Sequence, residues 1–382
     1  MGRDLLMTWM GASQQIHRQN MKVNAVAGKL YSKFREDGLR CCILKGQGNA
    51  LMYPNAYSRN PGDIDVWVNA SREDITEYAK RHFNLEDDIR FHHLETSLDG
   101  VPVELHFFPC TMNNPIYNAR LQKWFKRNAD LQCSNVVSLP DGIGEIAIPT
   151  SAFNVIYQLT HLYHHFFDEG IGMRQIIDYF LVVNDFSKNV FLNNDFSNPS
   201  VSLSKGSSTS HPSPLSSEER DVTALRCSEP LRSKDGGASK PSPNCAGWDR
   251  LSIEGDNSAT AVTSYASTAL DVVQRELKYL GLWKFAGAVM FVLHEVLGLA
   301  EDKMIVPVDE KRGRLLLAEI LNGGNFGQHF TKYGHFTQQG MAKKYFLKIW
   351  RNMHFVRYYP AEALSEPIFR TWHFFWRMKN KK

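Results

Sequence analysis

Two aspartates in one short run are the feature that most constrains how this chain folds. The run DIDVWV, residues 63–68, places Asp63 and Asp65 two positions apart at the start of an apolar, β-prone stretch. Successive side chains of a strand point to opposite faces, so both aspartates share one face, and Ile64, Val66 and Val68 share the other. Neighbouring carboxylates repel each other unless a cation lies between them. The run therefore predicts a strand whose second face meets solvent, an arginine or a metal ion.

The segments around this strand predict an α/β arrangement for residues 1–149. Residues 1–37 carry apolar side chains at helical spacing, and the run LRCCILKG at 39–46 is a short buried strand that ends in glycine. Ser71 is a suitable N-cap for a helix over SREDITEYAKRHF. Asp99-Gly100 joins two strand-like runs as a two-residue hairpin turn. We expect a small mixed sheet with helices packed against it.

The rest of the chain predicts helices and one long insertion. Residues 150–192 and 264–382 are amphipathic with helical spacing and indicate an all-α domain. Between them, residues 193–263 are dominated by Ser, Pro and Gly and contain few large apolar side chains. Such a segment cannot bury enough surface to offset its ordering entropy. We therefore expect a disordered insertion within the helical domain.

Charge and cysteine content narrow the class of protein. A net charge of +4 gives no whole-chain argument for nucleic-acid binding. The six cysteines form no CxxC pair, and the N-terminus resembles no signal peptide, so we expect a reducing, cytoplasmic setting. The apolar run 285–300 contains His294 and Glu295 and is interpreted as a buried helix rather than a membrane span. The aromatic and basic residues after 341 suit a nucleic-acid or membrane surface, but helical packing of the aromatics is favoured.

Two further motifs are expected to place a phosphate-binding turn and a third carboxylate near the aspartates. In ILKGQG, the backbone N–H groups of a glycine-bearing turn suit a phosphate, and Lys45 adds a positive charge. In VPVELHFF, Glu104 and His106 share one strand face. A hairpin that brings Glu104 beside Asp63 and Asp65 would gather three carboxylates near a phosphate cradle. Oxygen ligands of this kind suit Mg²⁺, and a metal pair clamps the attacking and leaving oxygens of phosphoryl chemistry.

The series LKG, YP, RNPGDIDVWV and VELH resembles the nucleotidyltransferases of the DNA polymerase β superfamily. It is most similar to a bacterial, largely uncharacterised nucleotidyltransferase family in which an LKG turn precedes a GDID strand. The later runs GIGMRQIIDY and YYPAEALSEP also resemble that family. The resemblance implies an α+β fold, with an N-terminal polymerase β-like domain and a small mixed sheet followed by an all-α domain. The implied activity is transfer of a nucleoside monophosphate from an NTP, ATP by default, to an unidentified acceptor hydroxyl.

The resemblance also implies roles for individual residues. Asp63, Asp65 and Glu104 would be the catalytic carboxylates and the ligands of two Mg²⁺ ions, with Mn²⁺ as an alternative. The residues implied to bind the nucleotide are Lys45, Gly46, Gln47, Arg59 and Gly62, and those expected to line the cleft are His106, Arg174 and Asp178. The superfamily turn usually reads Gly-Ser, whereas this chain has Gln47 after Gly46.

The sequence is also compatible with ordinary structural roles for several of these residues. Lys45 suits a surface position, Arg59 suits an ion pair with Asp63, and Arg174 suits an ion pair with Asp178 one helical turn away. His161, His164 and His165 lack an evident partner for zinc, so packing in the core or a substrate pocket is favoured. A non-catalytic nucleotide sensor on the same fold is the alternative function, because the usual serine is missing. Transfer of the nucleotide onto a protein or tRNA is the second alternative.

Overall fold

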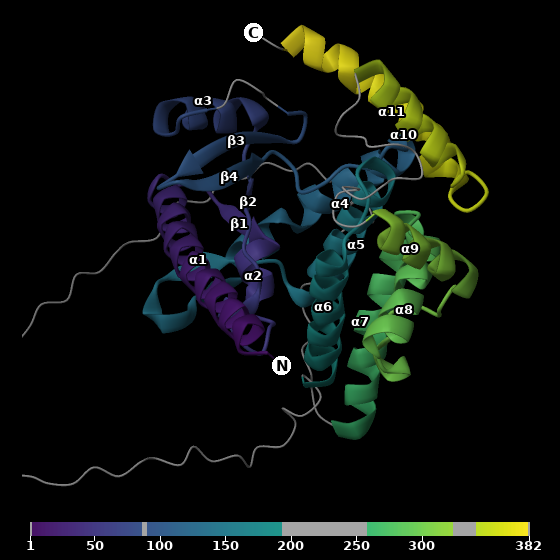
Figure 1. Ribbon diagram of the computed structural model, residues 1–382, viewed down its shortest axis with the longest axis horizontal. Coiled ribbons are helices and arrows are strands. Elements are labelled where there is room, and N and C mark those ends of the chain that lie inside the picture. Colours follow the sequence, from purple (N-terminus) through teal and green to yellow (C-terminus); the bar gives the residue numbers. More distant parts are fainter. Residues whose placement is uncertain (1, 86–89, 193–257, 324–340, 381–382) are drawn as a thin grey trace, which may run out of the picture.

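A four-stranded mixed sheet organises the N-terminal part of the protein (Figure 1). The computed structural model describes residues 2–85, 90–192, 258–323 and 341–380. The N-terminal elements are α1 (Arg3–Glu36), β1 (Cys41–Leu44), α2 (Gly46–Ala50), β2 (Ile64–Val68), α3 (Arg72–His82), β3 (His93–Leu98), β4 (Val101–His106), α4 (Pro115–Ser134), β5 (Val136–Ser138) and β6 (Glu145–Ala147). Short 3₁₀ helices span Ala56–Ser58 and Pro140–Gly142.

Strand order in the main sheet is β1-β2-β4-β3, and β2 and β4 run parallel while the outer pairs are antiparallel. The register places Asp65 opposite Glu104. The expected turn between β3 and β4 is present, with Asp99 at φ 51° and Gly100 at φ 72°, the left-handed pair that a tight two-residue hairpin requires. The expected N-cap is also present, because the Ser71 side chain accepts a hydrogen bond from the backbone of Asp74.

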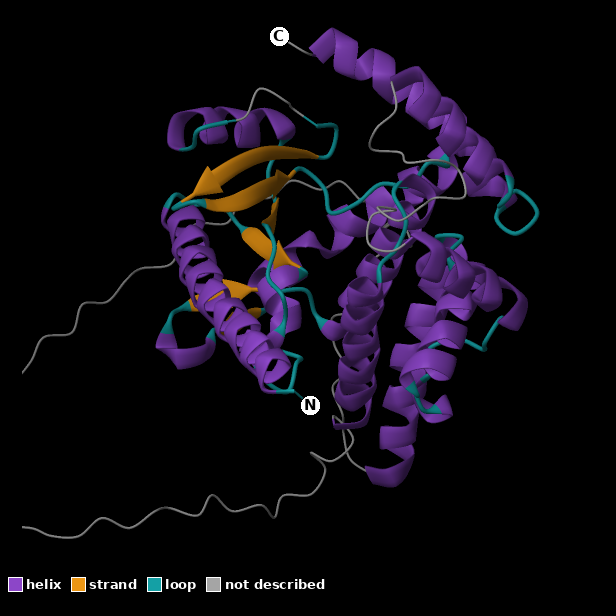
Figure 2. Cartoon of the chain, in the orientation of Figure 1, coloured by secondary structure: helices purple, strands orange, loops and turns teal. Residues whose placement is uncertain are grey.

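Helices cover both faces of this sheet (Figure 2). Ile64, Val66 and Val68 of β2 join a buried cluster with side chains of α1 and α3. On the other face, Leu44 and Trp67 pack in a second cluster with side chains of α4 and α5. The alternation expected along DIDVWV is therefore present, and each face of the sheet has a different hydrophobic core.

Helices follow the sheet region, so the expected α+β fold is confirmed. They are α5 (Ser151–Asp168), α6 (Met173–Leu192), α7 (Ser258–Tyr279), α8 (Trp283–Leu297), α9 (Glu310–Gly323), α10 (Met341–Met353) and α11 (Pro360–Asn380), with a 3₁₀ turn at Glu301–Lys303. The expected insertion, 193–263, lies mostly outside the described residues. The described part of the chain resumes at Ser258 with α7. Within the described part of the chain no helix is both long and apolar enough to cross a bilayer.

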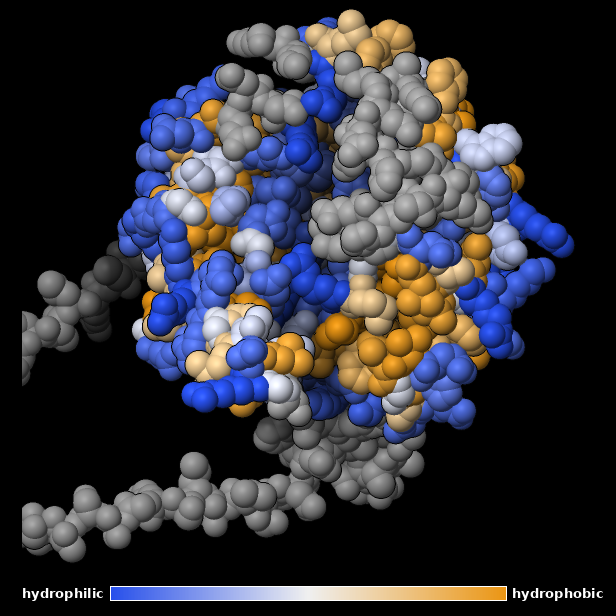
Figure 3. All heavy atoms as spheres, in the orientation of Figure 1, coloured by the Kyte–Doolittle hydropathy of each residue, from blue (hydrophilic) through white to orange (hydrophobic). Residues whose placement is uncertain are grey.

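The C-terminal helices only partly match the expectation that their aromatics are buried. Phe355 and Tyr359 lie in the core, but Phe346, Trp350 and Phe374 are each more than half exposed. Hydrophobic side chains accordingly show on the surface of these helices in Figure 3. Helix α11 also reaches across to the sheet region, where Phe369, Trp372 and Trp376 surround the ring of Phe91 edge to face.

Candidate active site

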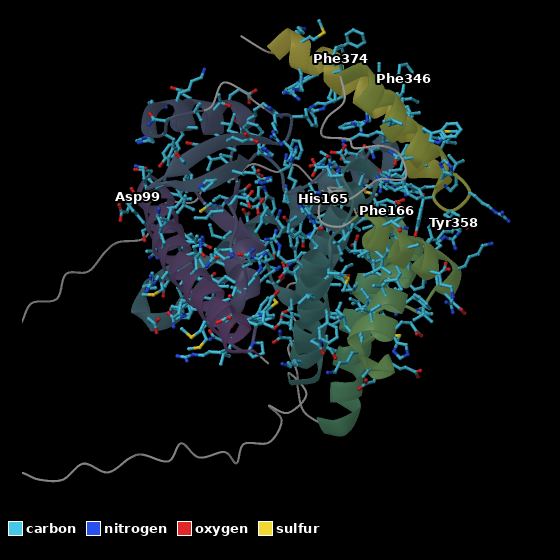
Figure 4. All side chains as sticks on the ribbon, viewed as in Figure 1. Asp99, His165, Phe166, Phe346, Tyr358 and Phe374 are labelled. Carbon is cyan, nitrogen blue, oxygen red and sulfur yellow. The ribbon has the colours of Figure 1, made fainter. Side chains whose placement is uncertain are left out.

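A cavity of about 290 Å³ lies between the polar side of the sheet and helices α5 and α6. Its sheet wall comes from β2, β3, β4 and the turn after β1, and its helical wall comes from α5, α6 and the loop that joins them. His165 of the helical wall lies near the centre of the molecule, between the two parts (Figure 4). The cavity includes every cleft-lining residue expected from the sequence, namely His106, Arg174 and Asp178.

Three carboxylates meet on the sheet wall. Asp65 and Glu104 are cross-strand neighbours in the parallel β2–β4 pair, and Asp63 directly precedes β2. All three line the cavity. Period-two alternation explains the gathering, because Leu105 and Val66, the next residues along each strand, belong to the opposite hydrophobic core.

Two cations of the protein itself neutralise part of this charge. Lys45 Nζ lies 3.0 Å from Asp65 Oδ1. His106 Nε2 lies 3.0 Å from the same oxygen and 3.2 Å from Glu104 Oε2. Asp65 is therefore held between two positive groups, whereas Asp63 has neither contact.

The pKa values reflect this division. Burial alone would raise the pKa of Asp65, but Lys45 and the hydrogen bond from His106 hold it well below its usual range. Burial by itself would lower the pKa of His106. The hydrogen bonds to Asp65 and Glu104 outweigh burial and raise that pKa to about 9. The charge of Asp65, followed by burial and Glu104, raises the pKa of Asp63 to about 6. The sheet wall therefore retains an excess of negative charge at Asp63.

The LKG turn brings its backbone to the edge of the cavity. Lys45 has φ 50° and ψ −131°, a conformation that is rare outside glycine, and Gly46 follows at φ 39°. Strain of this kind is stored where function demands a fixed backbone. The Lys45 ammonium also lies 2.9 Å from His161 Nε2 on α5, so this half-buried group links the two walls. The side chain of Gln47 is buried and donates to Asn24 of α1.

Arg59 and Asp178 form a second link between the walls. Their closest contact is 2.9 Å, both side chains are 8% exposed, and the Arg59 Nε also donates to the carboxylate. Tyr53 donates to Asp178 over 2.7 Å. Neither alternative pairing expected from the sequence is formed: Arg59 does not pair with Asp63, and Asp178 pairs with Arg59 rather than with Arg174. Among the described residues Arg174 has no ion pair, so it presents a free cation to the cavity.

Imidazoles dominate the remaining lining. Six of the chain's 14 histidines line the cavity: His92, His93, His106, His161, His164 and His165. Burial lowers the pKa of His93 and of His164 to about 4 in each case, so these rings are neutral at neutral pH. Sequence reasoning missed His92 and His93. The sequence pattern that could have indicated them is the pair HH at the start of a predicted strand, because the other strand of the same hairpin ends in ELH.

The sequence comparison identifies the class and then the family. The match places the chain in the nucleotidyltransferase superfamily. Within it, the chain belongs to the family described as uncharacterised nucleotidyltransferase, which matches residues 1–196. A solved structure, an antigenic nucleotidyltransferase-like protein from Paracoccidioides brasiliensis, is 15% identical, with a TM-score of 0.28 over 42% of this chain and 75% of that one. No curated protein matches the chain.

Proposed function

We propose that the protein transfers a nucleoside monophosphate from an NTP to an acceptor hydroxyl and releases pyrophosphate. The observation that carries the proposal is the β2–β4 register, which sets Asp65 beside Glu104 with Asp63 on the same cavity wall. The strained LKG turn borders the same wall. Carboxylates beside a phosphate-binding backbone are the parts that nucleotidyl transfer requires.

The residues present fit a divalent cation. The charge of Asp65, burial and the charge of Glu104 raise the pKa of Asp63, and a cation bound to Asp63 would relieve the repulsion. Oxygen donors suit Mg²⁺, with Mn²⁺ as an alternative. Asp63, Asp65 and Glu104 would hold the ions. When bound, two such ions would neutralise the charge of the triphosphate and align the reacting oxygens.

The chain's own groups account for the remaining tasks. Gly46 and Gly62 line the cavity where backbone approach to phosphate is needed, and Lys45 and Arg174 supply positive charge. The acceptor oxygen would bond to the α-phosphorus while the bond from that phosphorus to the bridging oxygen breaks, and pyrophosphate leaves. Glu104 is the carboxylate assigned to accept the proton of the acceptor hydroxyl. We place the reaction in a reducing, cytoplasmic setting, which the free, buried cysteines of the described chain support.

The test is pyrophosphate release from each of the four NTPs, ATP first, with Mg²⁺ and cell extract as the source of acceptor. We expect release by the wild type and none by the double variant Asp63→Asn, Asp65→Asn. Asp99→Asn is the matched control, because that exposed carboxylate pairs with Lys29 at the hairpin turn, outside the cavity. Equal release by the wild type and the double variant would refute the proposal.

The second candidate is a nucleotide sensor that does not catalyse transfer. The observation that favours it is that Lys45 and His106 already neutralise Asp65 and Glu104 without a metal ion. Saturable, Mg²⁺-dependent NTP binding without pyrophosphate release would identify this function. An NTP labelled at the α-phosphate identifies the class of acceptor. Label that enters a protein or tRNA fraction would show a macromolecular acceptor, and label that enters a small product would show a small-molecule acceptor.

A further inference from the structure

Three imidazoles gather on the sheet wall beside the carboxylates. His92, His93 and His106 each offer a ring nitrogen, and these three atoms lie within 4.8 Å of one another. The ring centroids are 4.2 Å apart for His92 and His93, 5.1 Å for His93 and His106, and 5.6 Å for His92 and His106. The β3–β4 register explains part of the cluster, because His93 is the cross-strand partner of His106.

The two buried rings share one bonding pattern. His106 contacts Asp65 through Nε2 at 3.0 Å, and His93 contacts Glu95 through Nε2 at 3.4 Å. The Nδ1 atom of each ring is buried without a hydrogen-bond partner, and the residues are only 3% and 2% exposed. Glu104 Oε2 approaches His93 Nδ1 to 3.4 Å, which is an electrostatic contact and not a hydrogen bond.

This pattern points to a ligand. Buried ring nitrogens are nearly always paired, so two orphans in one cluster require an explanation. A histidine that binds a metal characteristically directs its other ring nitrogen to a carboxylate, which fixes the ring and increases its basicity. His106 already has that carboxylate partner on Nε2 and an open nitrogen at Nδ1. Both ring nitrogens of His93 lie 3.4 Å from a carboxylate, Glu95 at Nε2 and Glu104 at Nδ1, and Nδ1 makes no hydrogen bond.

We propose that His92, His93 and His106 form a binding site for Zn²⁺, separate from the carboxylate site. Imidazole nitrogens favour Zn²⁺ and similar transition ions, whereas Mg²⁺ prefers oxygen. A metal binds neutral imidazole, so the ion would displace the proton that makes His106 a cation in the metal-free protein. Three histidine ligands leave one coordination position for water or substrate, as in catalytic zinc sites. The site does not depend on the proposed nucleotidyl transfer. The two sites are adjacent, because His106 contacts Asp65 and Glu104.

Helix α11 provides the support that such a site requires. Phe91 directly precedes His92, and its ring is enclosed by Phe369, Trp372 and Trp376 of α11. Arg72 lies over the rings of both Phe91 and Phe107, which flank the strands that carry the histidines. This apolar packing supports the His92–His93 segment on the side of α11.

The experiment measures metal content and a spectrum rather than activity. The full chain is loaded with Zn²⁺ or Co²⁺, dialysed, and assayed for bound metal and for the visible absorption of tetrahedral Co²⁺. We expect about one equivalent of either metal in the wild type. His92→Gln and His93→Gln should weaken binding by more than about a hundredfold, because even outer-shell partners of ligating histidines contribute ten- to a hundredfold.

Two controls make the test specific. His165→Gln removes a cavity imidazole from the opposite wall, and Asp63→Asn removes a carboxylate assigned to Mg²⁺; both should retain Zn²⁺ and Co²⁺. Circular dichroism and thermal unfolding verify that each variant is folded. His92→Gln decides the matter if His93→Gln misfolds, because the half-buried His92 ring contributes less to the core.

The outcomes for the two proposals are distinguishable. Absence of bound metal in the wild type, or retention of metal by folded His92→Gln, would overturn the zinc site. Loss of metal in Asp63→Asn but not in His92→Gln would also overturn it, since the ion would then belong to the carboxylates. Asp63→Asn that binds Co²⁺ normally but releases no pyrophosphate would support both proposals at once.

Discussion

The two faces of the sheet are built from the same strands and both have a hydrophobic core, but the face toward α5 also carries the charged groups of the cavity. Along β4, Val103 and Leu105 point into an apolar core shared with α1 and α3, while Glu104 and His106 point into the cavity. On β2, Val66 and Asp65 divide in the same way. The apolar face can stabilise the fold by burial, whereas the polar face accumulates like charges that oppose folding unless they are paired. Apolar burial and charge therefore alternate residue by residue along one strand.

The largest effect on activity is expected for Glu104→Gln on β4. The change removes a charge assigned to the metal site, so nucleotidyl transfer should fall by about a thousandfold, or about 4 kcal/mol. Thermal unfolding should stay near the wild-type midpoint. Initial rates of pyrophosphate release give the measurement, and a loss of less than about tenfold would show that the third carboxylate is not needed.

A second variant tests whether the polar side also contributes to stability. Arg59→Met leaves the buried Asp178 carboxylate without its cation, which should lower the free energy of unfolding by about 3–4 kcal/mol. Urea unfolding followed by circular dichroism measures it. The double variant Arg59→Met, Asp178→Leu should recover most of the loss, because no uncompensated charge remains. Failure to recover would mean that Arg59 acts through contacts other than this pair.

The apolar counterpart is Leu105→Ala, one residue from Glu104 on the opposite face. Leu105 is fully buried, so its truncation should lower the free energy of unfolding by about 3 kcal/mol through lost burial and a cavity. Transfer activity per folded molecule should be retained at temperatures below unfolding. If activity falls as far as in Glu104→Gln while the protein stays folded, the two faces are not functionally separate.

The smallest predicted effect is a gain in stability, expected for Asp63→Asn. The pKa of Asp63 is about 6 in the folded protein against an ordinary 3.8, so the folded state holds its proton more tightly. Stability of the metal-free protein should therefore fall as pH rises from about 4 through about 6. Asp63→Asn should remove this loss and stabilise the protein at pH 8 by about 1 kcal/mol, a value reduced for solvent screening because the side chain is exposed.

The measurement for this prediction is urea unfolding in EDTA at about pH 3 and at pH 8. At the lower pH the wild type and Asp63→Asn should be equally stable, because both lack the charge. Adding Mg²⁺ at pH 8 should stabilise the wild type more than the variant. A variant that is less stable than the wild type at pH 8 would contradict the repulsion inferred for this wall.

Local sequence was sufficient to predict the strands and hairpin that carry the carboxylates, but not His92 and His93 beside them or the contacts between the two walls. The period of two in DIDVWV and VELH, and the Asp99-Gly100 turn, are short-range signals, and the structure has the strands and hairpin that they predict. The contacts between the walls are long-range: Lys45 meets His161 across 116 residues, and Arg59 meets Asp178 across 119. No periodicity specifies which helix faces a strand end. For the same reason the true partners of Arg59 and Asp178 were not predicted.

The contacts of α11 have a consequence for the order in which the protein folds during its synthesis. This helix is made late, yet its aromatic rings enclose Phe91, and its Arg370 together with Lys348 of α10 pairs with Asp168 at the edge of the cavity. N-terminal segments leave the ribosome first and begin folding first. The strands can therefore form while the cavity still lacks its outer support. A chain that lacks α11 should therefore form the strands but leave Phe91 and Asp168 without these contacts.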